Sequence, residues 1–81
     1  MKKKYDVNVI AFLLRDYRET KAYKRELGRI YDLTISCSKD EAINWATKFM
    51  MDAIGSANGT RNDELRVRFL AAYDVRQSLI A

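Results

Sequence analysis

Proline is absent from this chain of 81 residues, and glycine occurs only at positions 28, 55 and 59. These two residue types are the strongest local breaks in regular structure, so their scarcity predicts a few long elements. Eighty-one residues suffice for one domain and not for two, so we expect residues 1–81 to form a single small domain. Hydrophobic residues make up 48% of the chain and charged residues 32%, which is typical of a folded globular protein.

The segment from Ser38 to Gly55 carries the clearest helix signal. Glu41 follows Ser38 at the spacing of a capping box, in which each side chain bonds the backbone N–H of the other residue. Apolar residues then recur at intervals of three and four, and Gly55 stands where a helix commonly ends. The sequence therefore predicts a helix over residues 39–54 whose buried stripe comprises Ala42, Ala46, Phe49, Met50, Ala53 and Ile54.

Alternation of apolar and polar residues predicts strands in other segments. Residues 5–14 begin with this alternation, residues 31–37 alternate up to the predicted helix, and residues 65–73 alternate after a polar loop at 56–63. A polar turn is expected at 16–20.

Two interpretations fit residues 21–30. In one, the segment is a strand with a bulge near Gly28, which would form a hairpin with residues 5–14. In the other it is a helix, with Tyr23, Leu27 and Ile30 on one face. We prefer the strand because it continues into residues 31–37.

These elements predict an α+β fold of the order β-β-α-β, a three-stranded antiparallel sheet with one helix packed on one face. The right-handed crossover rule places the strand at 5–14 in the centre. Several apolar side chains would then point away from the helix, although burying one Leu or Phe is worth about 1.5–3 kcal/mol. The chain's own C-terminus, a second copy or a partner should cover this face, which comprises Ile10, Phe12, Leu14, Leu70 and Ala72.

Residues suited to catalysis or metal binding are scarce. Histidine is absent, and the single cysteine, Cys37, can form neither an intramolecular disulfide nor a Cys/His zinc site. Glycine-rich phosphate-binding and nucleophile-elbow motifs are also absent. We expect no catalytic activity, no metal and no cofactor, and we expect Cys37 to be a buried core thiol rather than a nucleophile.

A net charge of +4, from 15 basic and 11 acidic residues, favours anionic partners. An apolar patch rimmed by arginine is typical of a protein interface. We expect Trp45, at the edge of the helical stripe, to cover the rim of the small core; the alternative is an exposed binding anchor. The residues that we predict to bind a partner are Phe12, Arg15, Arg18, Lys24, Arg25, Arg66, Arg68 and Leu70.

The sequence thus favours a non-catalytic protein-binding module, an inhibitor or an adaptor, whose partner is a protein, a nucleoprotein complex or a second copy of the chain. The alternative is a small basic nucleic-acid-binding domain that uses Lys4, Arg66 and Arg68 on the open sheet face, although the aromatic signature of RNA-binding sheets is missing. No stretch approaches the roughly 18 apolar residues of a membrane span, and no signal-peptide core follows the first lysines. We therefore expect a cytoplasmic protein that does not enter a membrane.

The segment DLTISCSKDEAINWATKFM, in which a predicted strand runs into the capped helix, covers about a quarter of the chain. With the small size, the basic balance and the lack of catalytic residues, this layout resembles small phage-encoded host-interaction proteins of the anti-CRISPR kind. The resemblance implies steric inhibition of a nucleic-acid-handling complex, with basic residues competing for carboxylates of the partner.

Overall fold

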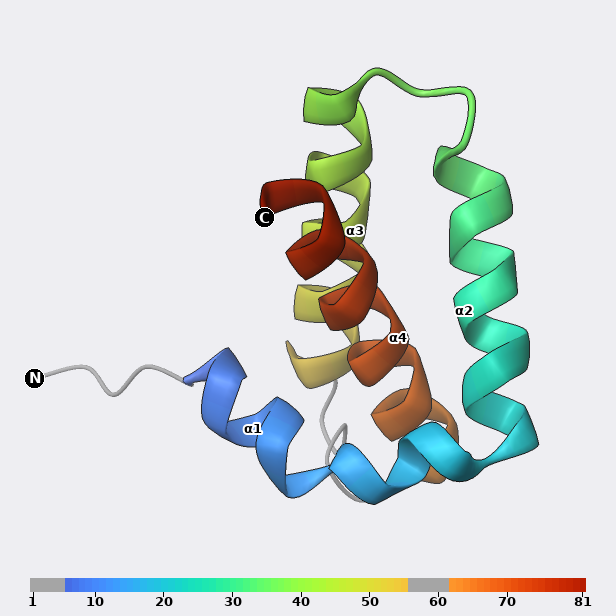
Figure 1. Cartoon of the computed structure of the whole chain (residues 1–81). Helices are drawn as coiled ribbons and strands as arrows, with labels where there is room; N and C mark the ends of the chain where they lie inside the picture. Colours follow the sequence, from blue (N-terminus) through green and yellow to red (C-terminus); the bar gives the residue numbers. More distant parts are fainter. Residues whose placement is uncertain (1–5, 56–61) are drawn as a thin grey trace, which may run out of the picture.

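The regular structure of this chain is helical. The computed structural model describes residues 6–55 and 62–81, and none of these residues belongs to a strand. The expected α+β fold with a three-stranded sheet is therefore wrong, and the fold is all-helical. Its elements are α1 (Val7–Leu13), a short 3-10 helix η1 (Arg15–Glu19), α2 (Lys21–Thr34), α3 (Lys39–Gly55) and α4 (Asp63–Ile80), as Figure 1 shows.

Helix α3 confirms the prediction for residues 39–54. The Ser38 Oγ accepts a hydrogen bond from the Glu41 N–H at 3.2 Å, and the Glu41 Oε1 accepts one from the Ser38 N–H at 3.1 Å. This is the predicted capping box. Gly55 belongs to the helix and does not have a positive φ, so it does not end α3 in the left-handed conformation that we expected.

The other three α-helices also begin at a polar side chain. Asp6, Thr20 and Asn62 each accept a hydrogen bond from a backbone N–H in the first turn of the helix that follows. Such caps satisfy N–H groups that have no partner inside the helix, and each is worth about 0.5–2 kcal/mol. The polar loop expected at 56–63 lies outside the described residues except for Asn62, which caps α4, and Asp63, which begins it.

For residues 21–30 the helical interpretation is correct and the preferred strand is wrong. Tyr23 and Ile30 are buried in α2, and Leu27 packs against the core beside them. The helix continues to Thr34, so the strand expected at 31–37 is wrong as well. Cys37 lies half-buried in the connection from α2 to α3, with its Sγ 3.7 Å from the Leu33 carbonyl oxygen, and not in the core.

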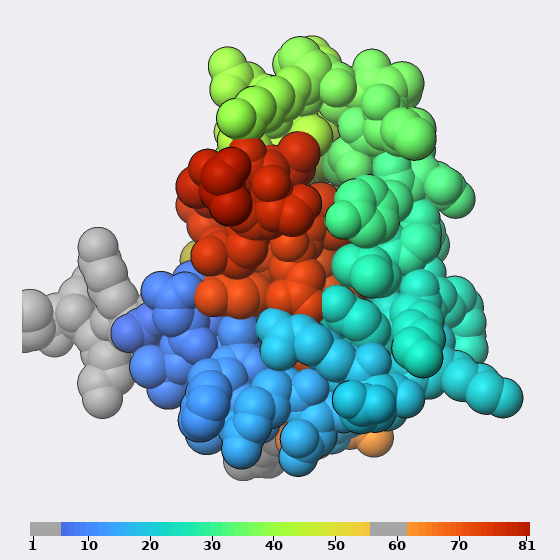
Figure 2. Space-filling view, in the orientation of Figure 1, coloured from blue at the N-terminus to red at the C-terminus, as the bar shows by residue number. Residues whose placement is uncertain are grey.

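Helix α4 is the centre of the molecule. Helices α2 and α3 pack mainly against α4 rather than against each other, while α1 and η1 lie across one end (Figure 1). Figure 2 shows the surface of this arrangement, with α1 and η1 closing the end opposite the α2–α3 connection. Because neighbours surround it, α4 buries side chains in several directions and lacks a continuous polar face.

Small residues allow α3 and α4 to lie close together. Ala42, Ala46 and Ala53 of α3 are buried, as are Ala71 and Ala72 of α4. The largest fully buried side chains come from α2 and α4 and are Ile30, Leu70 and Val75. Two aromatic residues, Tyr23 and Phe69, are buried in the same core, which is closely packed.

The helical fold removes the open apolar face that the predicted sheet would have had. Leu70 and Ala72 are buried in the core, and Ile10 and Leu14 pack against it. Of the five residues expected on that face, only Phe12 is exposed, at 61%. No second sheet face therefore needs a cover.

Candidate protein-binding surface

Phe12 and Arg15 lie together on the exposed side of α1 and η1. The Arg15 guanidinium carbon stands 4.1 Å from the centroid of the Phe12 ring, and Arg15 Nη1 donates to the Phe12 carbonyl oxygen at 2.8 Å. Val9 and Leu13 are also exposed on α1. The structure thus brings together two of the residues that we predicted to bind a partner.

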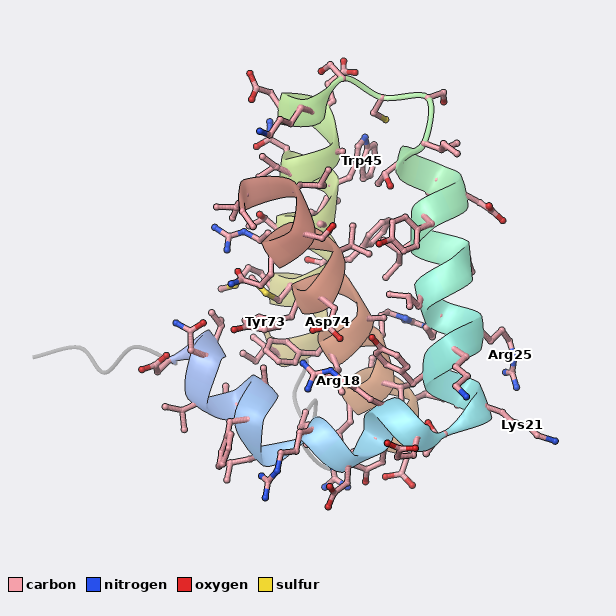
Figure 3. All side chains as sticks on the ribbon, in the orientation of Figure 1. Arg18, Lys21, Arg25, Trp45, Tyr73 and Asp74 are labelled. Atoms are coloured by element: carbon pink, nitrogen blue, oxygen red, sulfur yellow. The ribbon has the colours of Figure 1, made fainter. Side chains whose placement is uncertain are left out.

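Arg18 holds η1 against α4 by a bidentate ion pair with Asp74. Arg18 Nε donates to Asp74 Oδ2 at 2.8 Å, and Arg18 Nη2 donates to Asp74 Oδ1 at 2.7 Å. The Tyr23 hydroxyl donates to the same carboxylate at 2.5 Å. Burial, together with this hydrogen bond, raises the pKa of Tyr23 to about 12. The hydrogen bond to Asp74 likewise raises the pKa of Arg18 above its usual range. Both side chains are partly exposed, and Figure 3 shows Arg18 and Asp74, both labelled, close together where η1 meets α4. Arg18 therefore links these two elements.

Arg66 and Arg68 point from α4 toward different neighbours. Arg66 Nη1 donates to the Tyr17 hydroxyl at 2.9 Å and to Asp63 Oδ1 at 3.0 Å. Arg68 forms an ion pair with Glu26 of α2, with 3.5 Å between Arg68 Nε and Glu26 Oε1. The two arginines therefore do not form the joint basic face that the sheet predicted.

Lys24 and Arg25 lie exposed on α2, where their side chains form no ion pair within residues 6–55 and 62–81. Figure 3 shows Arg25 and its neighbour Lys21 projecting away from the molecule. Leu70, in contrast, is 0% exposed. It is part of the core, so the prediction that Leu70 reaches a partner is wrong. Lys4 lies outside the described residues.

An aromatic pair on α3 forms a different surface. The rings of Trp45 and Phe49 stack with their centroids 5.7 Å apart, and Trp45 remains 46% exposed. Figure 3 shows Trp45 extending from α3 toward α2, beneath the α2–α3 connection. Of the two interpretations of Trp45, exposure at the edge of the core favours the binding anchor.

Each ring of this pair borders a hollow. Trp45 lines a shallow hollow of about 250 Å³ together with Glu41, Asn44 and Lys48. Phe49 lines a more enclosed pocket of about 260 Å³, to which α2, α3 and α4 all contribute. The residues that line the second pocket are Arg29, Phe49, Asp52, Ala53, Leu65 and Arg68. We call the aromatic pair, together with the residues that line either hollow, the Trp45–Phe49 surface.

The enclosed pocket is rich in positive charge. Arg29 Nη2 and Arg68 Nε lie 3.1 and 3.5 Å from one and the same oxygen, Glu26 Oε1. The Arg68 Nε is buried and makes no hydrogen bond within the described part of the chain. Asp52 stands at the outer rim, in an ion pair with Lys48 at 3.6 Å.

More apolar surface lies at the same end of the molecule as Trp45. The C-terminal end of α2 and the N-terminal half of α3 are neighbours there (Figure 1). Tyr31, Leu33 and Ile35 at that end of α2 are exposed, Ile35 at 80%. Exposed aromatic and apolar side chains are typical of protein interfaces.

Sequence reasoning missed most of this surface. Phe49 was assigned to the core, and Arg29 belonged to a basic segment without being chosen as a binding residue. Only Trp45 carried a signal, its place at the edge of the helical stripe. The pocket requires α2, α3 and α4 to meet, which no local pattern in the sequence reports.

Comparison with protein-family models, with curated proteins and with solved structures found no match for this chain. The resemblance to anti-CRISPR proteins also loses part of its basis, because residues 31–34 continue a helix where a strand was expected.

Among the described residues, no helix is both long and apolar enough to cross a bilayer. Nor do acidic residues or Cys37 gather there in a group of three that could hold a metal ion.

Proposed function

We propose that this chain is a small non-catalytic protein-binding module, an inhibitor or an adaptor, which holds a segment of a partner protein on the Trp45–Phe49 surface. The observation that carries the proposal is the half-exposed Trp45 ring, held in place by its stack on Phe49. Tryptophan and arginine are the residue types most enriched among those that dominate binding energy. A ring that is already fixed loses little conformational entropy when a partner covers it.

Charge defines the kind of partner. Arg29 and Arg68 line a pocket with Phe49, and the whole chain carries a net charge of +4. Complementary charge speeds association and selects among partners. The segment that fits this surface is therefore apolar where it meets Trp45 and acidic where it meets the arginines.

A second candidate function, nucleic-acid binding, is favoured by the basic side of α2. Lys21, Lys24 and Arg25 are exposed there without ion pairs among the described residues. Cations arranged along one helix can follow a phosphate backbone. The affinity would then fall steeply as the salt concentration rises.

Capture from an extract of cells that produce the protein, with and without nuclease treatment, tests both candidates. The bait is the full chain, as wild type, as Trp45→Ala and as Met51→Ala. Met51 is the matched control because it lies on α3 and has the same exposure as Trp45, 46%. A hot-spot tryptophan contributes about 2 kcal/mol or more, so Trp45→Ala should weaken retention of the partner about 30-fold or more.

The proposal requires a protein that wild type and Met51→Ala retain and that Trp45→Ala loses. Equal retention by all three baits would contradict it. Capture that disappears with nuclease and with Lys24→Glu combined with Arg25→Glu, but persists in Trp45→Ala, would establish nucleic-acid binding instead.

A further inference from the structure

The lining of the enclosed pocket of the Trp45–Phe49 surface includes two arginines, Arg29 and Arg68, and one acidic residue, Asp52, which lies largely exposed and pairs with Lys48. Two guanidinium groups, those of Arg29 and Arg68, share a single oxygen of Glu26. Arginine presents several N–H donors in a fixed fork and is built for carboxylates that it can bind through two bonds. The closest contact of each arginine is with the same oxygen, Glu26 Oε1: Arg29 Nη2 donates one hydrogen bond to it at 3.1 Å, and Arg68 Nε lies 3.5 Å from it.

Arg68 Nε lacks a hydrogen-bond acceptor within the described part of the chain. This nitrogen is buried and lies 3.5 Å from Glu26 Oε1. A buried donor without a partner is unfavourable, and buried polar atoms in native proteins are nearly always satisfied. An incoming acceptor would therefore gain a donor that is already desolvated.

The rest of the pocket decides what can bring this acceptor. Phe49, Ala53 and Leu65 provide apolar walls. The volume of about 260 Å³ lies below the range of about 300–1,000 Å³ that is usual for pockets holding drug-sized molecules. The space suits one acidic side chain whose methylene groups contact the walls while its carboxylate reaches the arginines.

We propose that this pocket binds an aspartate or glutamate side chain of the partner protein, with Arg68 and Arg29 as its ligands and Glu26 as an internal competitor for them. This inference rests on the proposed function, since it specifies the partner residue that the same surface recognises. Glu26 holds the two guanidinium groups in place in the free protein. The partner's carboxylate then competes with Glu26 for the N–H donors of the two guanidinium groups.

Two capped dipeptides, N-acetyl-Leu-Glu-amide and N-acetyl-Leu-Gln-amide, test this proposal because they differ only in the charged group. The full chain is titrated with each at low ionic strength, where charge interactions are least screened, and side-chain N–H resonances of arginine are followed by NMR. The glutamate peptide should shift the Arg68 Nε–H signal saturably, with a dissociation constant of about 1–10 mM as expected for so small a ligand. The glutamine peptide should bind at least about tenfold more weakly, because it lacks the charge-assisted bonds.

Three variants give effects of opposite sign. Arg68→Met, which keeps an apolar stem, should abolish the preference for glutamate. Arg15→Gln, which removes the same charge at a residue that does not line the pocket, should preserve it. Glu26→Gln should tighten binding of the glutamate peptide about threefold or more, since the competing carboxylate is gone. Loss of folding cannot mimic a gain in affinity.

Equal shifts with both peptides, an unchanged preference in Arg68→Met, or weaker binding to Glu26→Gln would each overturn the carboxylate pocket. Such a failure differs from failure of the proposed function. If the pocket shows no charge preference while partner capture still depends on Trp45, only the acidic side chain is excluded. If the pocket prefers glutamate but capture ignores Trp45, the protein-binding role of the aromatic pair is wrong.

Discussion

Trp45 stacks on Phe49 one helical turn further along α3, with the two ring centroids 5.7 Å apart, while nearly half of Trp45 faces solvent. Aromatic pairs of this kind gain about 0.5–1.5 kcal/mol beyond the area that they bury. The stack therefore fixes Trp45 without covering it. A side chain that is fixed and open is prepared for contact with another molecule.

The capping box of α3 should be measurable in stability. Replacing Ser38 by Ala removes the acceptor for the Glu41 N–H, and we expect the free energy of unfolding to fall by about 0.5–2 kcal/mol. Urea denaturation measures this change. Ser36→Ala, in the connection before the helix, is the control and should change the free energy by less than about 0.5 kcal/mol. Equal effects of the two substitutions would mean that the box does not stabilise α3.

The Asp74 carboxylate should contribute more than an ordinary surface acid. Asp74→Ala leaves the Arg18 guanidinium and the Tyr23 hydroxyl without their shared acceptor. Because the site is partly open to solvent, we expect a loss of about 1.5–3 kcal/mol in the free energy of unfolding. Asp32→Ala on the exposed side of α2 is the matched control. A difference of less than about 0.5 kcal/mol between the two variants would show that the link from Arg18 to Asp74 is not stabilising.

Tyr23 should make the folded protein sensitive to alkaline pH. Its pKa in the folded state is raised from 10.0 to about 12, first by burial and then by the hydrogen bond to Asp74. Below pH 10 the hydroxyl keeps its proton in both states, so its contribution is fully present. Between pH 10 and 12 the unfolded chain releases this proton more readily than the folded chain, and stability falls.

The comparison of wild type with Tyr23→Phe isolates this effect, because the other titrating groups are common to both. The urea midpoint of wild type should fall more steeply between pH 10 and 12 than that of the variant. Parallel curves would show that Tyr23 does not titrate differently in the two states.

Leu70 and Phe12 should respond to truncation in opposite ways. Leu70→Ala creates a cavity in the core and should lower the free energy of unfolding by about 2–5 kcal/mol. Phe12→Ala removes an exposed ring whose main contact is the Arg15 guanidinium, and it should cost less than about 1 kcal/mol. Thermal and urea unfolding of both variants measure the difference. A mild effect at Leu70 would contradict its place in the core.

The sequence predicts the helix whose start and buried face are both marked by residues close together in the chain. Helix α3 carries a capping box at Ser38 and Glu41 and one apolar stripe, and both depend only on residues close in the chain. Helix α2 carried the right period as well, in Tyr23, Leu27 and Ile30. The strand interpretation depends on neighbouring strands, and residues 6–55 and 62–81 form none.

The sequence of helix α4 resembles that of a strand for a physical reason. A central helix is buried on several sides, so its apolar residues do not form a stripe. Arg66 and Arg68 supplied the polar positions of an apparent strand, yet both lie half-buried, with their charged heads reaching Asp63 and Glu26. The signal that was overlooked is Asn62, a capping residue followed by two acidic residues at the start of the helix.

The candidate site was only partly predictable for the same reason. The place of Trp45 at the edge of a helical stripe can be seen in the sequence. The sequence does not show that Arg29 and Arg68 both contact Glu26, because this contact depends on how α2 and α4 pack. Several of the predicted binding residues would share one face of the expected sheet. The helical fold places them on separate surfaces.

The central claim is that a partner covers Trp45, and a ¹⁹F label on this residue tests it most directly. Trp45 is the only tryptophan in the chain, so labelling with 5-fluorotryptophan gives one resonance that reports on one ring. In the free protein this resonance should depend on the solvent isotope, H₂O or D₂O, because the ring is half exposed. We expect the resonance to shift and its isotope dependence to fall when a saturating amount of the unlabelled, nuclease-treated partner is added. An unchanged resonance and an unchanged isotope dependence in the complex would contradict the claim.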